Sequence, residues 1–403
     1  MNNPPDKVKT ALVLPGGGAR GAFQVGVLKA LAELTPHGRP NPFSVISGTS
    51  AGAVNSVVLA SGAQEFRSAV AELERVWGQF RCHHVYKTDH LTMLKSSLHW
   101  MASLVLGGWL VGTPKSLLNN APLRALLSQN VHFPRIRDAI DAGCLDAVAV
   151  TAAGYASARS TTFFEGDPQQ EGWERTRRLG KQIELNLDHL MASIAVPMIF
   201  PPVCIGNEFF GDGAMRQATP LSPAVHLGAD RILVIGIRDE TGEKTPDAPG
   251  DPPSFAQIAG YMLDTLFMDG LYSDLERMTR INQLIDSVAP ENRDGPMQSM
   301  RAIDTMLIVP SKDLREIAYR HRKQLPFAVR SLLRGIGGRG PSENRLLSFL
   351  MFEQAYTREL IELGYQDAMK VREPLLDFVS GAEVPRLFAP AWIKNDLSAF
   401  HTD

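Results

Sequence analysis

The stretch TALVLPGGGARGAFQVGVLKALAEL, residues 10–34, decides how this chain is organised. Its first five residues are mostly aliphatic or β-branched and stop at a proline, which predicts a short buried strand. Three glycines follow, and then Phe23, Val27, Leu28 and Leu31 recur at helical spacing. The stretch therefore predicts a strand, a glycine-rich loop and a helix in direct succession.

The next segment repeats this order. A short apolar strand is expected at 43–46, followed by the tight turn GTSAG at 48–52 and a helix over 51–60. Strands that alternate with helices are typical of α/β folds with parallel strands. The same patterns predict further strands at 145–151, 161–164, 231–237 and 302–309, and helices at 117–127, 185–194 and 346–363.

Composition excludes several classes of protein. The 403 residues are 44% hydrophobic and 21% charged, which allows a large core and excludes a disordered or collagen-like chain. The net charge of −2 gives no basic field, so we expect no nucleic-acid partner. The three cysteines and ten histidines show no zinc-site spacing, so no metal is expected. The few cysteines and the lack of a signal-peptide pattern in the first ten residues predict a cytoplasmic protein.

The chain divides into two expected parts. Residues 8–310 are predicted to form a catalytic α/β domain, and residues 311–403 a mostly helical C-terminal region. The segment LHWMASLVLGGWLVG at 98–112 is apolar but too short to span a membrane. It is interpreted either as a lid or peripheral membrane-contact segment, or as a buried core helix.

The GTSAG turn has the form G-x-S-x-G between a strand and a helix. Such a turn exposes the serine hydroxyl, and the small residues Gly48 and Gly52 let the backbone approach itself closely. The N-terminus of the following helix would stabilise negative charge near Ser50. Two interpretations stay open, a nucleophilic serine or an ordinary turn whose serine caps the helix.

The GGGARG loop at 16–21 lies between the first strand and the first helix. Consecutive glycines leave backbone amides free to converge on an anion, and in a hydrolase they would form an oxyanion hole with the amide of Ala51. Arg20 would either hold this loop or meet a phosphate-bearing substrate. The loop also matches G-x-G-x-x-G, but no Asp or Glu occurs between Glu33 and Glu65, so no nucleotide is expected.

The third motif is GDGA at 211–214. An acid flanked by glycines either projects into a cleft or forms a common Asp-Gly turn. As a base for a serine, Asp212 would need a pKa raised by burial. The order Ser50, Asp212, His226 also fits a Ser-Asp-His triad, although His226 and His189 both lie in segments that are expected to be helical.

Taken in order, these motifs resemble the patatin-like phospholipase family. Its pattern is G-G-G-x-[RK]-G, then G-x-S-x-G, then D-G-[AG], and the stretch ASIAVPMIFPPV at 192–203 is similar to the family's block before the aspartate. The resemblance covers roughly residues 10–309. It implies a central, mostly parallel sheet sandwiched by helices, with no metal and no cofactor.

The resemblance also implies roles for individual residues. Ser50 would be the nucleophile and Asp212 its base, as a dyad without histidine. The amides of Gly17 and Gly18 would hold the oxyanion, in an oxyanion hole that also includes Gly16, Arg20 and Ala51. The remaining residues of the implied site belong to the same motifs and are Gly48, Gly52, Gly213 and Ala214.

The implied reaction is hydrolysis of fatty-acyl esters of lipids or phospholipids through an acyl-serine, as in a phospholipase A or lysophospholipase. The substrate would lie at a membrane surface. Two alternatives use the same residues, an acyltransferase with the same acyl-serine and a catalytically silent lipid-binding protein. The sequence carries no signal for an oligomeric state.

Overall fold

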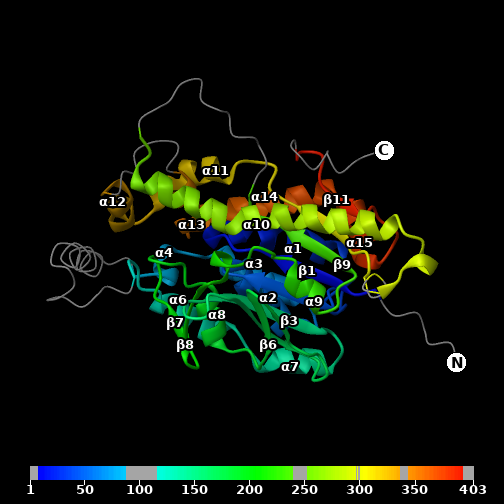
Figure 1. Cartoon of the computed structure of the whole chain (residues 1–403). Helices are drawn as coiled ribbons and strands as arrows, with labels where there is room; N and C mark the ends of the chain where they lie inside the picture. The colour runs from blue at the N-terminus through cyan, green and yellow to red at the C-terminus, as the bar shows by residue number, and fades with distance from the viewer. Residues whose placement is uncertain are drawn as a thin grey trace.

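The computed structural model consists of a central sheet with helices packed on both sides, which confirms the predicted α/β class (Figure 1). It describes residues 8–87, 116–238, 252–295, 297, 300–335 and 344–393. The segment at 98–112 lies outside these ranges. None of the helices within them combines the length and the apolar character that a membrane span requires.

The sheet is mostly parallel, as expected. Its order is β11-β10-β9-β1-β2-β3-β4-β6-β5, and every neighbouring pair from β11 to β3 is parallel. The short strands β7 and β8 add antiparallel pairs beside β3. The strands are β1 (Thr10–Leu14), β2 (Val45–Thr49), β3 (Ala147–Gly154), β4 (Ser160–Gly166), β5 (Trp173–Arg175), β6 (Arg178–Gln182), β7 (Val203–Ile205), β8 (Glu208–Asp212), β9 (Arg231–Ile235), β10 (Asp304–Ile308) and β11 (Leu387–Phe388).

All six predicted strands fall on observed ones, but β2 is shifted towards the serine turn. It pairs with β1 on one side and β3 on the other from Val45 onwards, and Thr49 still pairs with Thr151. Ladder hydrogen bonds from two neighbours therefore extend the strand through the small polar residues that precede Ser50.

The helices cover both faces of this sheet. They are α1 (Ala22–Leu34), α2 (Ala51–Ser61), α3 (Phe66–Trp77), α4 (Cys82–Val85), α6 (Ala121–Asn130), α7 (Pro134–Asp141), α8 (Leu187–Ser193), α9 (Ser222–His226), α10 (Phe255–Asp286), α11 (Leu314–His321), α12 (Phe327–Gly335), α13 (Asn344–Leu350), α14 (Gln354–Lys370) and α15 (Arg372–Ser380). Short 3₁₀ turns at Gly18–Gly21 and Gly213–Met215 follow β1 and β8.

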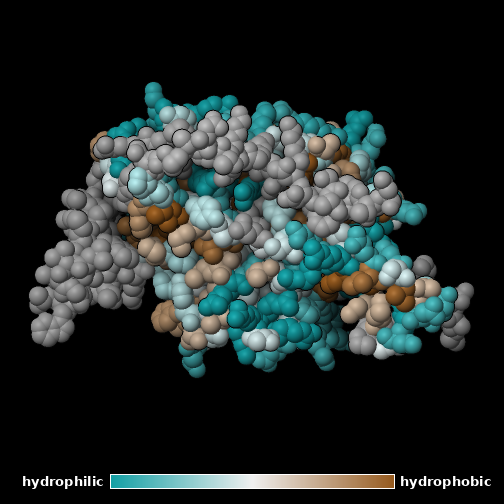
Figure 2. Space-filling view, turned by 45° about the horizontal axis from the view of Figure 1, so that its top comes forward, coloured by the Kyte–Doolittle hydropathy of each residue, from teal (hydrophilic) through white to brown (hydrophobic). Residues whose placement is uncertain are grey.

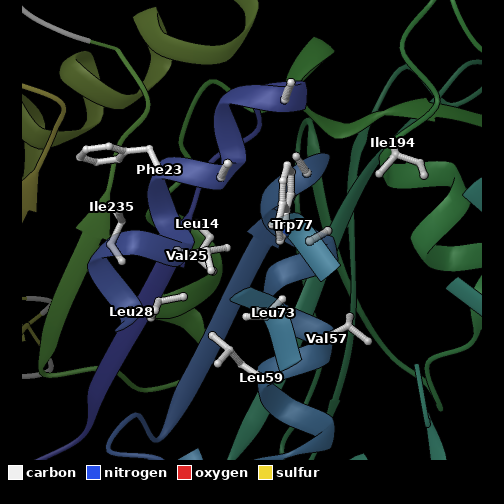
Figure 3. Close-up of a cluster of buried hydrophobic side chains, with 14 of the residues drawn as sticks. Leu14, Phe23, Val25, Leu28, Val57, Leu59, Leu73, Trp77, Ile194 and Ile235 are labelled. Carbon is white, nitrogen blue, oxygen red and sulfur yellow. The ribbon is translucent and has the colours of Figure 1, made fainter. Parts of the chain in front are cut away.

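Alternating side chains of β1 feed two separate cores. Leu12 and Leu14 pack with α1, α2 and α3, whereas Ala11 and Val13 face α9 and α10. Because successive side chains of a strand point to opposite faces, one fully buried strand serves both layers. Figure 3 shows Leu14 beside Val25 and Leu28 of α1, with Trp77 of α3 in the same layer.

The longest described helix, α10, was not predicted. It begins at a capping box in which the hydroxyl of Ser254 accepts a hydrogen bond from the amide of Gln257 while the Gln257 side chain accepts one from the amide of Ser254. Phe255 and Met262 are exposed although Leu263 and Phe267 on the same helix are buried. Apolar residues on several sides blur the helical period, which hid this element from pattern analysis.

The C-terminal helices pack directly on the α/β body. α14 lies along α1, and β11 extends the sheet beyond β10. Because the two parts pack against each other in this way, the expected division into two parts near residue 310 stays a prediction.

The predicted helix at 346–363 is wrong as a single element, because α13 ends at Leu350 and α14 starts at Gln354. Glu353 between them has an extended backbone, and its carboxylate accepts a hydrogen bond from the amide of Cys82.

The crossing of α1 and α14 requires two glycines. A Cβ at Gly26 would lie 2.0 Å from the carbonyl oxygen of Ile361, and one at Gly364 would lie 2.2 Å from that of Phe23. The neighbouring atoms are backbone, so a side chain could be accommodated only by moving the helices apart.

We predict that Gly26→Ala lowers the free energy of unfolding by about 3 kcal/mol, because overpacking at a backbone contact outweighs the gain in helix propensity. Thermal unfolding followed by circular dichroism measures the change. Gly335→Ala is the matched control, since no heavy atom of the described residues lies within 4 Å of a Cβ there. Equal melting temperatures for Gly26→Ala and wild type would contradict the close crossing.

Candidate active site

Ser50 occupies a strained turn between β2 and α2. Its backbone has φ 55° and ψ −127°, a conformation that non-glycine residues rarely adopt. The turn is tight on both sides, because a Cβ at Gly48 would lie 2.4 Å from the carbonyl oxygen of Gly52, and one at Gly52 would lie 2.0 Å from that of Leu14. Steric crowding thus explains why Gly48 and Gly52 have no side chain. Ser50 itself lies at the N-terminus of α2.

The register of β3 brings Asp212 to this serine. Thr49, the last residue of β2, pairs with Thr151, and Asp212, the last residue of β8, pairs antiparallel with Ala152. The two strands therefore end against each other along one edge of β3. The amide of Asp212 also donates to the carbonyl of Ala195, 2.8 Å away, in the 192–203 stretch.

The carboxyl of Asp212 is buried, with 1% of the residue exposed. Burial raises its pKa to about 7, although the hydroxyl of Ser50 and the amide of Ala214 act in the opposite direction. The Ala214 amide donates to Oδ1 at 3.0 Å, while Oδ2 makes no hydrogen bond of regular geometry to the described residues. The carboxyl therefore has one anchored oxygen and one oxygen free to take a proton.

Gly213 allows the backbone after Asp212 to pass close to β3. A Cβ there would lie 2.2 Å from the carbonyl oxygen of Thr151. The glycine after the aspartate is thus required by the approach of two backbones, as at Gly48 and Gly52. Ala214 supplies the amide that holds Asp212.

Two polar residues to which no role was assigned from the sequence also support the serine turn. The hydroxyl of Ser193 accepts the amide of Ser50 at 2.9 Å and donates to the carbonyl of Thr151 at 2.7 Å. Gln217 hydrogen-bonds the hydroxyls of Thr49 and Thr151. Both lie more than 140 residues from Ser50. Ser193 belongs to the 192–203 stretch, whereas Gln217 lies in none of the quoted motifs.

The glycine loop borders Ser50 on another side. A Cβ at Gly16 would lie 2.7 Å from the Cβ of Ser50, and Gly18 has φ +54°. Within the described ranges, the amides of Gly17, Gly18 and Ala51 donate to no other group. These amides are available to an oxyanion next to the serine.

Arg20 does not serve as an oxyanion donor. Its amide donates to the carbonyl of Gly17, and its buried guanidinium binds Asp264 and Ser348. Of the two roles that the sequence left open, the geometry fits the one in which Arg20 holds the loop. The expectation that Arg20 belongs among the oxyanion-hole residues is therefore corrected.

An apolar cleft opens at Ser50, Gly18 and Ala51. Its walls come from both predicted parts of the chain, and the large side chains among them are Trp77, Phe80, Phe200, Phe267, Phe349 and Phe352. Polar atoms contribute almost nothing to this lining apart from the serine turn and the loop. Such a cleft suits a hydrocarbon chain rather than a charged group.

The two histidines weighed as partners have other surroundings. His226 stacks on Trp173, and burial lowers its pKa to about 4. His189 is buried against Phe163, and its ring accepts the amide of Asn186 at 3.1 Å in a helix cap. Neither ring is among the groups that shift the pKa of Asp212. Within the described ranges, no cluster of His, Cys, Asp and Glu side chains has the arrangement of a metal site.

Comparison with known proteins identifies the family of the chain. Residues 12–225, more than half of the sequence, match the patatin-like phospholipase family. No curated protein matches the sequence closely enough to be counted as a relative.

Solved structures that match the chain include human GIVD cytosolic phospholipase A2, at 14% identity and a TM-score of 0.42, covering 93% of this chain and 59% of that one. VipD from Legionella pneumophila matches at 13% identity and a TM-score of 0.35, covering 91% and 67%. ExoU of Pseudomonas aeruginosa, in complex with SpcU, matches at 17% and 0.27, covering 96% and 74%. This chain thus spans less than two thirds of the human enzyme. By the match over residues 12–225, the chain belongs to the patatin-like phospholipase family.

Proposed function

We propose that this chain is a serine acyl hydrolase that cleaves fatty-acyl esters of lipids, with Ser50 as nucleophile and Asp212 as base. Membership of the family supports lipid acyl hydrolysis in general. The observation that carries the residue assignment is the meeting of β2 and β8 on β3, which sets a strained serine beside a buried carboxyl with a pKa of about 7.

The reaction proceeds in two steps. Ser50 Oγ attacks the ester carbonyl while Asp212 takes its proton, and the amides of Gly17, Gly18 and Ala51 stabilise the oxyanion. The C–O bond to the alcohol then breaks, and Asp212 returns the proton to the leaving oxygen. Water attacks the acyl-serine with Asp212 again as base, which releases the fatty acid and regenerates Ser50.

A carboxyl with a pKa near 7 suits this double role. An ordinary aspartate is a weak base, whereas a pKa close to the working pH balances the deprotonated fraction against proton affinity. The environment of Asp212 supplies the shift through burial, without a second charge. A histidine is therefore not needed to match the pKa of the base to neutral pH.

The apolar cleft accounts for the choice of a lipid substrate. Phe267, Phe349 and Phe352 would surround the acyl chain, and the ester would lie at Ser50. Removing a long acyl chain from water is favourable by about 0.8 kcal/mol for each CH₂ group, so the cleft favours long chains over acetyl esters.

The surface beside the cleft supports a membrane-bound substrate. Phe255, Ile258 and Met262 form an exposed apolar face on the first half of α10, the helix whose Leu263 and Phe267 line the cleft. Apolar patches are visible on the face of the molecule in Figure 2. We propose that this α10 face contacts the lipid surface, so that the protein acts as a peripheral membrane enzyme.

We predict that Ser50→Ala and Asp212→Asn each lower kcat by about a thousandfold or more, because either change removes half of the proposed dyad. Hydrolysis of a p-nitrophenyl ester and of phosphatidylcholine measures the loss. His226→Ala is the control and should retain activity within twofold. A large loss in His226→Ala with the fold intact would contradict a dyad.

The pH dependence follows from the pKa of Asp212. Because the base must be deprotonated to accept the serine proton, kcat/KM should rise with pH and reach half of its plateau near pH 7. Rates on a soluble ester between pH 5 and pH 9 measure this midpoint. A midpoint near pH 4 would mean that Asp212 has an ordinary pKa.

The raised pKa of Asp212 also predicts a difference in stability between wild type and Asp212→Asn, which tests the pKa independently of activity. A carboxyl whose pKa is raised in the folded state favours folding less as pH rises from about 4 to 7. Asp212→Asn should therefore be more stable than wild type by up to roughly 4 kcal/mol at pH 8, which corresponds to about three pKa units. At pH 4 the two proteins should have nearly the same free energy of unfolding. An equal gain at both pH values would point to a cause other than titration.

The α10 face gives a prediction specific to lipid surfaces. Phe255→Ser combined with Met262→Ser should lower hydrolysis of phosphatidylcholine vesicles at least fivefold and leave the soluble ester unaffected, because both side chains are more than half exposed and outside the cleft lining. Leu284→Ser, an equally exposed apolar residue in the second half of α10, is the matched control. Equal loss on both substrates would contradict a docking role.

A further inference from the structure

Arg20 is the largest side chain in the fully buried part of the described core, and it links three segments distant in sequence. Nη1 donates to Asp264 Oδ1 of α10 at 2.9 Å. Nε and Nη2 both donate to the hydroxyl of Ser348 in α13, at 2.9 and 2.7 Å. The guanidinium carbon also lies 3.9 Å from the centre of the Phe349 ring.

The partners of Arg20 are themselves fixed. Ser348 donates its own hydrogen to the carbonyl of Arg345 at 2.6 Å, which leaves its oxygen to accept from the guanidinium. The Asp264 carboxylate also meets Arg345, with 3.3 Å between Oδ2 and Nε. A planar guanidinium held at three nitrogens and stacked on a ring has one orientation.

The same two helices contact the glycine loop itself. A Cβ at Gly18 would lie 2.4 Å from the carbonyl oxygen of Phe349, and one at Gly16 would lie 2.6 Å from the Phe267 ring. α13 and α10 therefore abut the loop at Gly18 and Gly16, and the Arg20 side chain ties the end of the loop to both helices.

We infer that Asp264 and Ser348 are positioning residues for the oxyanion amides and act through Arg20. This inference rests on the proposed function, because it assigns α10 and α13 to the same site. Both helices lie beyond residues 12–225, the part matched by the family. α10 and α13 thereby complete the active site.

The physical reason is preorganisation of the loop. Oxyanion donors contribute fully only when their N–H groups already point at the place where charge develops. Gly17 and Gly18 have little intrinsic rigidity, so the loop takes its geometry from what it packs against. Without Ser348, two buried N–H groups of Arg20 lose their acceptor, and the guanidinium and the loop attached to it would shift.

The test compares Ser348→Ala, Asp264→Asn and Arg20→Lys with wild type on a short p-nitrophenyl ester. We expect kcat to fall at least tenfold in each variant while KM stays within twofold, because the ester contacts none of these side chains. Arg20→Lys combined with Ser348→Ala should be no slower than the slower single variant, since both changes break the same link. Hydrogen exchange of the amides at 16–21 should accelerate in Ser348→Ala.

Asp367→Asn is the matched control. Asp367 is a buried carboxylate in α14 whose hydrogen bonds, among the described residues, go to Ser311 and Lys370 and not to the loop. Its loss should lower the melting temperature and leave kcat unchanged. A decrease in kcat as large as that of Asp264→Asn would mean that general destabilisation explains the effect, and the inference would be wrong.

Two outcomes separate this inference from the proposed function. An active wild type with unchanged kcat in Ser348→Ala, and unchanged exchange of the loop amides, overturns the positioning role alone. A folded wild type that hydrolyses neither the ester nor phosphatidylcholine overturns the proposed function, and the inference fails with it.

Discussion

The proposed active site depends on two strands that end against each other on the same edge of β3. β2 arrives parallel and stops at Thr49, opposite Thr151, and β8 arrives antiparallel and stops at Asp212, opposite Ala152. Because ladder hydrogen bonds fix both registers, the residues at these two strand ends must be neighbours. A slip of one residue in either strand would turn its side chains to the other face and separate Ser50 from Asp212.

This arrangement costs stability. Ser50 has a positive φ, and Asp212 is buried with no positively charged partner among the described residues, so its ionised form is disfavoured. The surrounding structure has to offset both costs. Ser193 accepts a hydrogen bond from the amide of Ser50, and Asp212 is hydrogen-bonded to the backbone of Ala214 and Ala195. The cores on both faces of the sheet fix the strands. A strained serine and a carboxyl with a raised pKa are features expected of a reactive site rather than of a structural one.

The sequence was sufficient to predict motifs within short segments, but not interactions between residues that are distant in the sequence. The glycine loop, the serine turn and the GDGA corner were predictable because tight backbone approaches demand glycine at fixed spacing, and the buried strands because β-branched and aliphatic runs are short and continuous. The roles of Ser193, Gln217, Asp264 and Ser348 could not be predicted, since each residue acts through hydrogen bonds to residues that are distant in the sequence. Arg20 was ambiguous for the same reason, because only its partners distinguish a loop anchor from an anion ligand. α10 was missed because it has apolar residues on both its buried and its exposed sides.

The most direct measurement of the central claim is covalent labelling of the nucleophile. An alkyl fluorophosphonate should react with a serine whose hydroxyl is activated by a neighbouring base, losing fluoride and adding one phosphonyl group to the protein. Intact-mass spectrometry and peptide mapping should find a single adduct on Ser50, formed more slowly below pH 7 and strongly slowed in Asp212→Asn. An adduct on another residue, or labelling of Ser50 at the same rate in Asp212→Asn, would contradict the account.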